Sequence, residues 1–438
     1  MLLNLLLISL LLYPYKQALY LTESISLYEI LVPLILFLFL INFSLGRLHP
    51  PKLLLNGIAI LLAAKFLAIL ISIANGFNFT LHYFARDIGF YVLICAVASL
   101  LRTEAAHERF LKVLIFSFFI SNVLIVAAYL LFVFGGNRDF LSVLLTVFRQ
   151  KEIAASISKF GFPIFFTQTT DYLYRASIGN AVDYAFENVY FVPVLIYSLL
   201  NSGRRRTKIF LFFATVLCFI AILISFSRSA LIALVIVLLT IFLQQKRQVN
   251  VWKCILVVVC TCAILFVGII ASNEGLSRFA DKRFGLNTSG GYSSFGEQVM
   301  SDRSVNNRLS FFKVAVQIFL DNPLGIGLGN FMEENEKITG IWNSAESMYA
   351  QMLAEEGLMI VLLFTIVVIV LGGFFVARNR YHNRFYCKIY SAFLITYLIT
   401  AFFYTAQSEM LGYVMLGATF STAFLGHKGS LEKQNAAL

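Results

Sequence analysis

Residues 208–243 read KIFLFFATVLCFIAILISFSRSALIALVIVLLTIFL. Two apolar runs, 208–225 and 228–243, are separated only by a short polar turn that carries Arg228. A transmembrane helix needs about 20 mainly apolar residues, and its backbone groups must be paired within the segment because lipid offers no partners. The stretch therefore predicts two membrane-spanning helices joined by a tight turn, with a charged side chain at the membrane surface.

The composition of the whole chain agrees with this pattern. Of its 438 residues, 59% are hydrophobic and 13% are charged, whereas a soluble domain has about 25% charged residues. The apolar runs are continuous, which excludes a membrane β-barrel with its alternating pattern. The predicted fold class is all-α, a polytopic helical membrane protein of about twelve spans. The candidate spans are 2–13, 25–43, 53–74, 83–101, 110–134, 184–200, 208–225, 228–243, 253–271, 357–376, 388–404 and 409–426.

The distribution of Lys and Arg predicts the orientation, because positive charge collects in cytoplasmic loops. The alternate short connections contain only Lys16 and Arg228. Fifteen Lys and Arg residues lie in the connections 44–52, 102–109, 201–208, 244–253 and 377–388. This set and both termini are therefore expected in the cytoplasm. The net charge of +11 reflects the same bias and does not indicate nucleic-acid binding.

Two long connections are then expected to face outward, and they divide the chain. Val305, Leu309, Phe312, Val316 and Phe319 recur at helical spacing in the second one, ahead of Asn322-Pro323. The predicted parts are an N-terminal bundle 1–134, an outer loop 135–183, spans six to nine in 184–271, a large outer loop with amphipathic helices in 272–356, and spans ten to twelve with a cytoplasmic tail in 357–438.

Charged residues near the predicted outer face are the functional candidates, since charge at membrane depth is costly. The planar donor fork of arginine suits phosphate, so Arg228 and Arg308 could neutralise a diphosphate leaving group in place of a metal. Glu346 is the carboxylate available to accept a hydroxyl proton. Neither long outer loop contains a histidine, which excludes a loop histidine as the base.

These residues also have simpler interpretations. Arg228 could snorkel to lipid head groups, and Arg308 could solvate an amphipathic helix. Ser344 could cap a helix that holds Glu346 in its first turn, where an acid suits the helix dipole. Tyr349, three residues after Glu346, would share its helix face and could stack on a sugar.

The remaining charged residues also have simpler, structural interpretations. Arg86 and Asp87 could form a structural ion pair inside the bundle, while Lys65 in the third span has no partner that the sequence identifies. Arg303, like Arg278 and Arg283, could be an ordinary loop charge. The six cysteines show no trustworthy zinc spacing, so we expect free thiols and no metal.

Three motifs carry a family resemblance. SFSRSAL at 225–231, NRLSFFKVAVQIFLDNPLGIGLGNF at 307–331 and AESMYAQMLAEEGLMIVLLF at 345–364 resemble segments of the bacterial O-antigen ligase and polymerase superfamily. Each motif is degenerate, and their order and spacing over roughly 208–376 make the match specific. Arg228 and Arg308 match the two arginines of the family pattern by position. Glu346, followed by serine, stands where ligases place a histidine followed by asparagine, which favours the polymerase branch, the Wzy type.

The resemblance implies a fold similar to the C-type glycosyltransferases and no metal or other cofactor. It implies a polyprenyl (undecaprenyl) diphosphate-linked oligosaccharide as substrate, membrane lipid around it, and a chain-length regulator protein as a further partner. Arg303, Arg86 and Tyr349 would then contact substrate on the periplasmic side of the bacterial inner membrane. The alternatives left open are a glycan ligase or O-oligosaccharyltransferase of the same superfamily and a twelve-span secondary transporter, for which Arg86, Asp87 and Lys65 would line a path.

Overall fold

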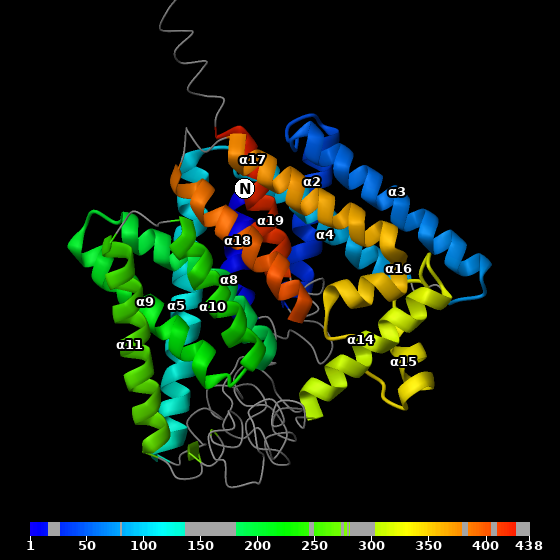
Figure 1. Ribbon diagram of the computed structural model, residues 1–438. Helices are drawn as coiled ribbons and strands as arrows, with labels where there is room; N and C mark the ends of the chain where they lie inside the picture. The colour runs from blue at the N-terminus through cyan, green and yellow to red at the C-terminus, as the bar shows by residue number, and fades with distance from the viewer. Residues whose placement is uncertain are drawn as a thin grey trace, which may run out of the picture. The chain divides into compact units, whose positions relative to one another are not determined.

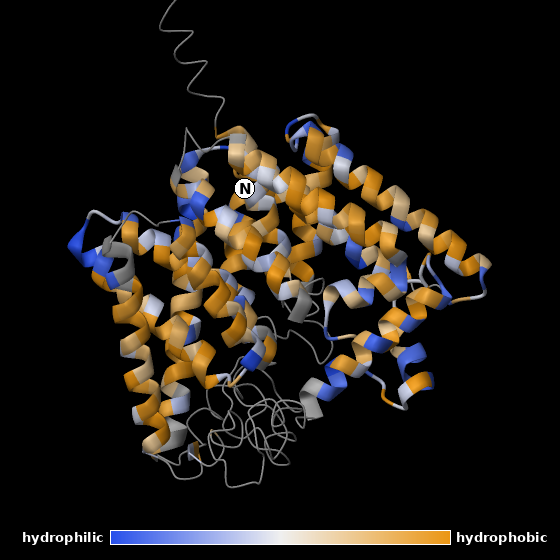
Figure 2. Cartoon of the chain, viewed as in Figure 1, coloured by the Kyte–Doolittle hydropathy of each residue, from blue (hydrophilic) through white to orange (hydrophobic). Residues whose placement is uncertain are grey.

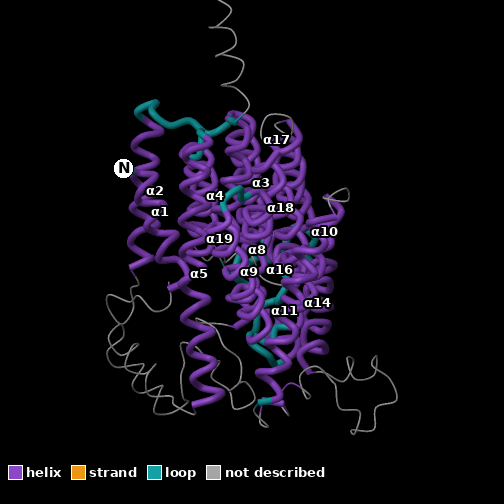
Figure 3. Tube along the Cα trace, turned by 90° about the vertical axis from the view of Figure 1, so that its left-hand side faces the viewer, coloured by secondary structure: helices purple, strands orange, loops and turns teal. Residues whose placement is uncertain are grey.

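The computed structural model of the protein describes most of the predicted spans and the second half of the second outer loop (Figure 1). The described residues are 1–15, 27–78, 81–135, 181–244, 249–272, 276–277, 280, 303–378, 384–403 and 410–425. Throughout this part of the chain the regular elements are helices, and Figure 3 shows no strand among them. The predicted all-α class is confirmed.

Several of the helices have the length and apolarity of membrane spans. Within the described residues, five stretches are long and apolar enough to cross a membrane, namely Lys52–Ala74, Leu81–Leu100, Glu104–Ala127, Arg205–Ile224 and Met348–Ala377. Six shorter apolar helices are Leu2–Leu12, Ile30–Ser44, Arg228–Gln244, Ile255–Ala271, Phe385–Ala401 and Met410–Phe424. Each of the twelve predicted spans coincides with a helix. The chain is a polytopic helical membrane protein.

The chain divides into two compact units, and unit 1 comprises Met1–Leu38 and Glu108–Gly291. Its helices are α1 (Leu2–Leu12), η1 (Tyr13–Tyr15), the first part of α2 (Leu27–Ser44), most of α5 (Glu104–Gly135), α8 (Ala181–Asn201), α9 (Arg205–Ile224), α10 (Arg228–Gln244) and α11 (Val249–Ala271). In this unit α8 packs against both α9 and α10, and α11 packs against α9.

Unit 2 comprises Phe39–His107 and Tyr292–Leu438. Its helices, besides the ends of α2 and α5, are α3 (Lys52–Ala74), α4 (Leu81–Leu100), α14 (Arg303–Asp321), α15 (Phe331–Thr339), α16 (Met348–Thr365), the π-helix η4 (Ile366–Leu371), α17 (Gly372–Arg378), α18 (Arg384–Phe403), α19 (Met410–Ser421) and η6 (Thr422–Phe424). Here α4 packs along α19, and α16 contacts α3, α14 and α18.

The surface of the helices is apolar, as a protein surrounded by lipid requires. Figure 2 shows hydrophobic residues along most of each helix. Large apolar side chains such as Phe213, Val267 and Met359 are more than half exposed, at 56%, 62% and 62%. A helix that is apolar on all sides is stable only when its outer face meets lipid or another apolar surface.

The helix predicted inside the large outer loop is confirmed as α14, but the predicted stripe is not its packed face. Phe311, Val314, Ala315 and Ile318 are buried, whereas Leu309 and Phe312 of the predicted stripe are 44% and 50% exposed. Both sets have helical spacing, so periodicity alone could not choose between them. α14 therefore has two apolar faces, one of which packs against α16.

Candidate active site

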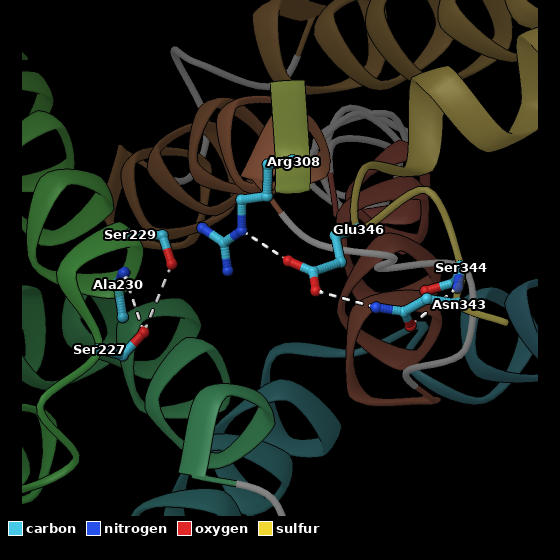
Figure 4. Close-up of polar contacts among 7 residues, drawn as sticks. All are labelled: Ser227, Ser229, Ala230, Arg308, Asn343, Ser344 and Glu346. Atoms are coloured by element: carbon cyan, nitrogen blue, oxygen red, sulfur yellow. Dashed lines mark hydrogen bonds and ion pairs between the residues drawn. The ribbon is translucent and has the colours of Figure 1, made fainter. Parts of the chain in front are cut away.

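Unit 2 brings two of the three predicted catalytic residues into direct contact. The Nε of Arg308, on the second turn of α14, donates to Oε2 of Glu346 over 2.6 Å. The two side chains are 33% and 34% exposed, so the pair is accessible from outside the protein. Figure 4 shows the two terminal nitrogens of the guanidinium turned away from the Glu346 carboxylate. These donors remain available to a ligand, because an arginine carries five N–H groups.

Glu346 lies outside the helix that follows it, which corrects the simpler interpretation of this residue. The N-cap of α16 is Ser347, whose side chain accepts from the backbone N–H of Ala350. Ser344 is not the cap, and Glu346 is not in the first turn. Its φ of 51° is left-handed, so Glu346 does not share a helix face with Tyr349. Tyr349 is instead the second residue of α16 and is half-buried.

A small hydrophobic core fixes the elements that carry this pair. Phe311 and Ala315 of α14 pack with Ala350 and Ala354 of α16, and Phe331 at the start of α15 completes the cluster. The alanines on α16 allow the two helices to approach closely. The positions of Arg308 and Glu346 are therefore set by one packed interface between α14 and the first turns of α16.

Arg228 belongs to unit 1, where it is the first residue of α10. Ser227 caps this helix, because its Oγ accepts from the N–H of Ala230 over 3.4 Å (Figure 4). A cation in the first turn opposes the helix dipole, whereas an anion bound there meets both the dipole and the guanidinium. Arg228 is half-buried, as expected for a charged side chain at the end of an apolar helix.

Backbone strain marks both candidate segments. Among the described residues, Phe226 and Glu346 are the only non-glycine residues with positive φ, at 50° and 51°. Phe226 is fully buried, and its ring contacts Phe266 with centroids 5.6 Å apart. Residues held in this region cost about 1–3 kcal/mol each and cluster at functional sites. The strain lies in the turn before Arg228 and at Glu346 itself.

The structure gives Lys65 the partners that the sequence could not identify. Its Nζ lies 2.7 Å from Oδ2 of Asp87 and 2.6 Å from Oε2 of Glu356, and all three side chains are at most 4% exposed. Arg86 is only a distant partner of Asp87, with its Nη2 3.9 Å from Oδ1. The guanidinium of Arg86 lies over the ring of Tyr83, 5.0 Å from its centroid. The ion pair expected between Arg86 and Asp87 is thus secondary to that between Lys65 and Asp87.

The turn GIGLGN, 325–330, closes on a break in α16. Gly357 has φ 80° and ψ 170°, which interrupts the helix after Glu356. The carbonyls that lose their helical partners are taken by the turn, since the N–H groups of Ile326 and Gly327 donate to Ala354 and Glu355 over 3.0 and 2.8 Å. The N–H of Phe331 donates to the Glu355 carboxylate over 3.3 Å. The turn 325–330 therefore acts as a clamp, by which we mean that its hydrogen bonds hold the broken end of α16 in place at the start of the tenth predicted span.

Unit 1 contains a buried polar cluster that sequence reasoning missed. Tyr13 donates to Glu187 over 2.8 Å, and Asn122 donates to Asn188 over 2.9 Å. Tyr184 also donates to Asn122. The signal was the polar pair Glu187-Asn188 inside an apolar span. These side chains are buried and hydrogen-bonded to one another, which satisfies polar groups inside the bundle.

Some predicted positions are described in part or lie outside the description. Arg303 is the first residue of α14, and only its backbone is described. Arg278, Arg283 and most of the loop 135–183 lie outside the described residues. Within the described part of the chain, no group of three or more His, Cys, Asp or Glu side chains is arranged to hold a metal ion.

Comparison with known proteins agrees with the motifs. Residues 213–365 match the family Wzy_C, described as O-Antigen ligase. The matched range contains the turn before Arg228, the Arg308–Glu346 contact and the break at Gly357. Comparison with curated proteins gave no match. The match places the segment 213–365 of this multi-pass membrane protein in the O-antigen ligase/polymerase superfamily.

Proposed function

We propose that this protein polymerises polyprenyl-diphosphate-linked oligosaccharide units into a surface polysaccharide on the outer face of the inner membrane. The observation that carries the proposal is the contact of 2.6 Å between Arg308 and Glu346. It joins a cation and a carboxylate at the point where a loop helix meets the start of a membrane span. Both side chains are accessible, and both lie in the segment that matches the superfamily.

In the proposed reaction, a hydroxyl of the acceptor sugar attacks the anomeric carbon of the donor glycan. A new carbon–oxygen bond forms at that carbon, and the bond to the diphosphate oxygen breaks with its electron pair leaving on the diphosphate. Glu346 takes the hydroxyl proton, and the free guanidinium nitrogens of Arg308 stabilise the charge that develops on the leaving group. Attack opposite the leaving group inverts the anomeric centre.

The other candidate residues take supporting roles in this proposal. Arg228 would hold the diphosphate together with the first N–H groups of α10, where helix dipole and guanidinium act in the same direction. Arg303, Arg86 and Tyr349 would contact the glycan or its phosphates. The guanidinium of Arg86 lies against the Tyr83 ring, which orients it without neutralising its charge.

Glu346 followed by Ser347 favours polymerisation over ligation. A ligase of this superfamily would be expected to carry histidine and asparagine there. The description O-Antigen ligase of the matching family nonetheless makes ligation a second candidate. Purified acceptors separate the two: elongation of the lipid-linked unit itself supports the polymerase, whereas product on lipid A core or on a protein supports the ligase.

The test uses purified protein in liposomes with a synthetic lipid-linked repeat unit. Arg308→Ala and Glu346→Gln are expected to abolish long-chain product, because each removes one partner of the pair. Lys313→Ala is the matched control, since Lys313 is an exposed cation on the same helix. Normal chain lengths in Arg308→Ala at equal amounts of inserted protein would refute the assigned role.

A further inference from the structure

A buried charge cluster in unit 2 has no role in the reaction as proposed. Lys65 of α3 bridges Asp87 of α4 and Glu356 of α16, with contacts of 2.7 and 2.6 Å. The contact with Asp87 is a hydrogen bond, whereas the oxygens of Glu356 make no aligned hydrogen bond and meet Lys65 as an ion pair. Three helices that are distant in sequence are joined at one ammonium group.

The cluster is costly unless it is complete. Removing one partner of a buried ion pair leaves an uncompensated charge and is strongly destabilising, whereas replacing both partners by apolar residues is often neutral. Without Lys65, the carboxylates of Asp87 and Glu356 would face each other in an apolar bundle. Lys65 therefore neutralises two carboxylates, from α4 and α16, at the place where α16 packs against α3.

Glu356 is the last residue before the helix breaks at Gly357. The segment Met348–Glu356 is a short helix with an acid at its C-terminal end, where the helix dipole disfavours negative charge. Lys65 supplies the compensating cation, and the turn 325–330 supplies hydrogen bonds to the carbonyls of Ala354 and Glu355, which have no helical partner. The C-terminal end of this short helix is thus anchored to α3.

The other end of the same short helix carries the reacting pair. Ser347 caps it, and Glu346 precedes the cap. Its middle packs through Ala350 and Ala354 against α14, the helix that holds Arg308. A shift of the anchored end therefore changes the position of Glu346 relative to Arg308.

We propose that Lys65 is a positioning residue, which sets the geometry of the Arg308–Glu346 pair by anchoring Glu356. The proposal rests on the proposed function for its effect on catalysis, but its effect on geometry is independent of it. Displacement of a reacting group by about 1 Å costs about 100-fold in rate. A small movement of the short helix would therefore be enough to lower the rate of polymerisation.

The experiment compares four proteins in which spin labels report the geometry directly. The labels are attached at Leu309→Cys, one residue after Arg308, and at Trp342→Cys, four residues before Glu346. Both positions are exposed, and the background has no native cysteines. The proteins are the labelled parent, Lys65→Met, Lys65→Met/Glu356→Met and the control Lys52→Met, which changes an exposed lysine at the first residue of the same helix. Each is measured for label distances and for polymerisation in liposomes.

We expect Lys65→Met to broaden the distance distribution and to lower polymerisation about 100-fold. The double variant should narrow the distribution relative to Lys65→Met and recover part of the activity, because it removes the uncompensated carboxylate on the short helix, while Asp87 keeps its contact of 3.9 Å with Arg86. If Lys65→Met does not fold, Glu356→Gln is used alone, since it keeps the pair of Lys65 and Asp87, and a broadened distribution is expected there too. Lys52→Met should match the parent.

The outcomes separate the two proposals. An unchanged distance distribution in Lys65→Met overturns the positioning role, whatever the activity. A double variant that stays as broad as Lys65→Met also overturns it. A broadened distribution with full activity supports the positioning role and refutes the proposed function, because the geometry of Arg308 and Glu346 would then be irrelevant to the reaction.

Discussion

Gly325→Ala tests how tightly the turn 325–330 holds the broken end of α16. Gly325 has φ +88°, and a Cβ at this position would lie 2.4 Å from the carbonyl oxygen of Glu355 and 2.7 Å from the nitrogen of Glu356. Both neighbours are backbone atoms, so no flexible side chain can move aside. The turn and α16 would have to separate by about 1 Å to reach an ordinary contact.

The expected cost follows from the contacts that this separation breaks. The hydrogen bonds from Ile326 to Ala354 and from Gly327 to Glu355 contribute about 1 kcal/mol each. The left-handed backbone costs an alanine about 1 kcal/mol more than a glycine. The sum is about 3 kcal/mol. Gly340→Ala is the control, because Gly340 has φ +72° and an added Cβ would meet nothing within 4 Å. Only the backbone cost of about 1 kcal/mol applies there.

The two variants should therefore differ by about 2 kcal/mol, which corresponds to roughly 4–8 °C in melting temperature for a unit of this size. Scanning fluorimetry in detergent measures the difference directly. Hydrogen exchange at Ile326 and Gly327 should accelerate in Gly325→Ala and remain unchanged in Gly340→Ala. If both variants melt at the same temperature, the contact between the turn and α16 is not tight and the clamp is refuted.

Substitutions at three further positions probe single contacts. Ser347→Ala should destabilise the start of α16 by about 1 kcal/mol, and Ser347→Asp should not, as measured by hydrogen exchange at Ala350. Tyr390→Phe removes the buried hydrogen bond of 2.7 Å to Nδ1 of His107, and it should cost about 1–3 kcal/mol in thermal unfolding. Lys337→Met should leave the melting temperature unchanged near neutral pH, because ion pairs of an exposed lysine with Glu333 and Glu334 contribute little to stability. Hydrogen bonds to Glu334 and then Glu333 raise the pKa of Lys337, so any stability it adds is present below the usual lysine pKa and is lost only as pH rises through the folded value.

The spans were predictable because lipid imposes one rule on the whole segment. Each of the twelve runs was apolar, and each became a helix, since a backbone in lipid has few other ways to pair its polar groups. The helix of the outer loop was predictable from its period, but not its packed face. Leu309, Phe312 and Phe311 are all apolar, and only the alanines of α16 decide which of them is buried.

The polar contacts were less predictable, because they join residues that are distant in sequence. Arg308 and Glu346 were singled out by chemistry and family pattern, but their contact depends on how α14 packs on α16. Lys65 appeared without a partner, because one of its partners, Glu356, lies 291 positions further along the chain. The period of a helix relates residues three or four positions apart, so it cannot predict contacts between residues on different helices.

The position of Glu346 just outside α16 separates two roles that an acidic group could have there, namely capping the helix and taking part in the reaction. A carboxylate in the first turn of a helix accepts hydrogen bonds from the N–H groups there. These bonds stabilise the carboxylate, but they also take up the oxygens that a reaction would need. In this protein Ser347 caps the helix, and the left-handed backbone at Glu346 turns its carboxylate to Arg308 instead. The strain of that backbone, about 1–3 kcal/mol, is opposed by the cap on one side and by the buried Ala345 on the other. The cap and the pair should therefore be separable. Ser347→Asp keeps the helix start and the reaction, whereas Glu346→Gln keeps the fold and loses the reaction, and loss of both properties in either variant would show that one group serves both purposes.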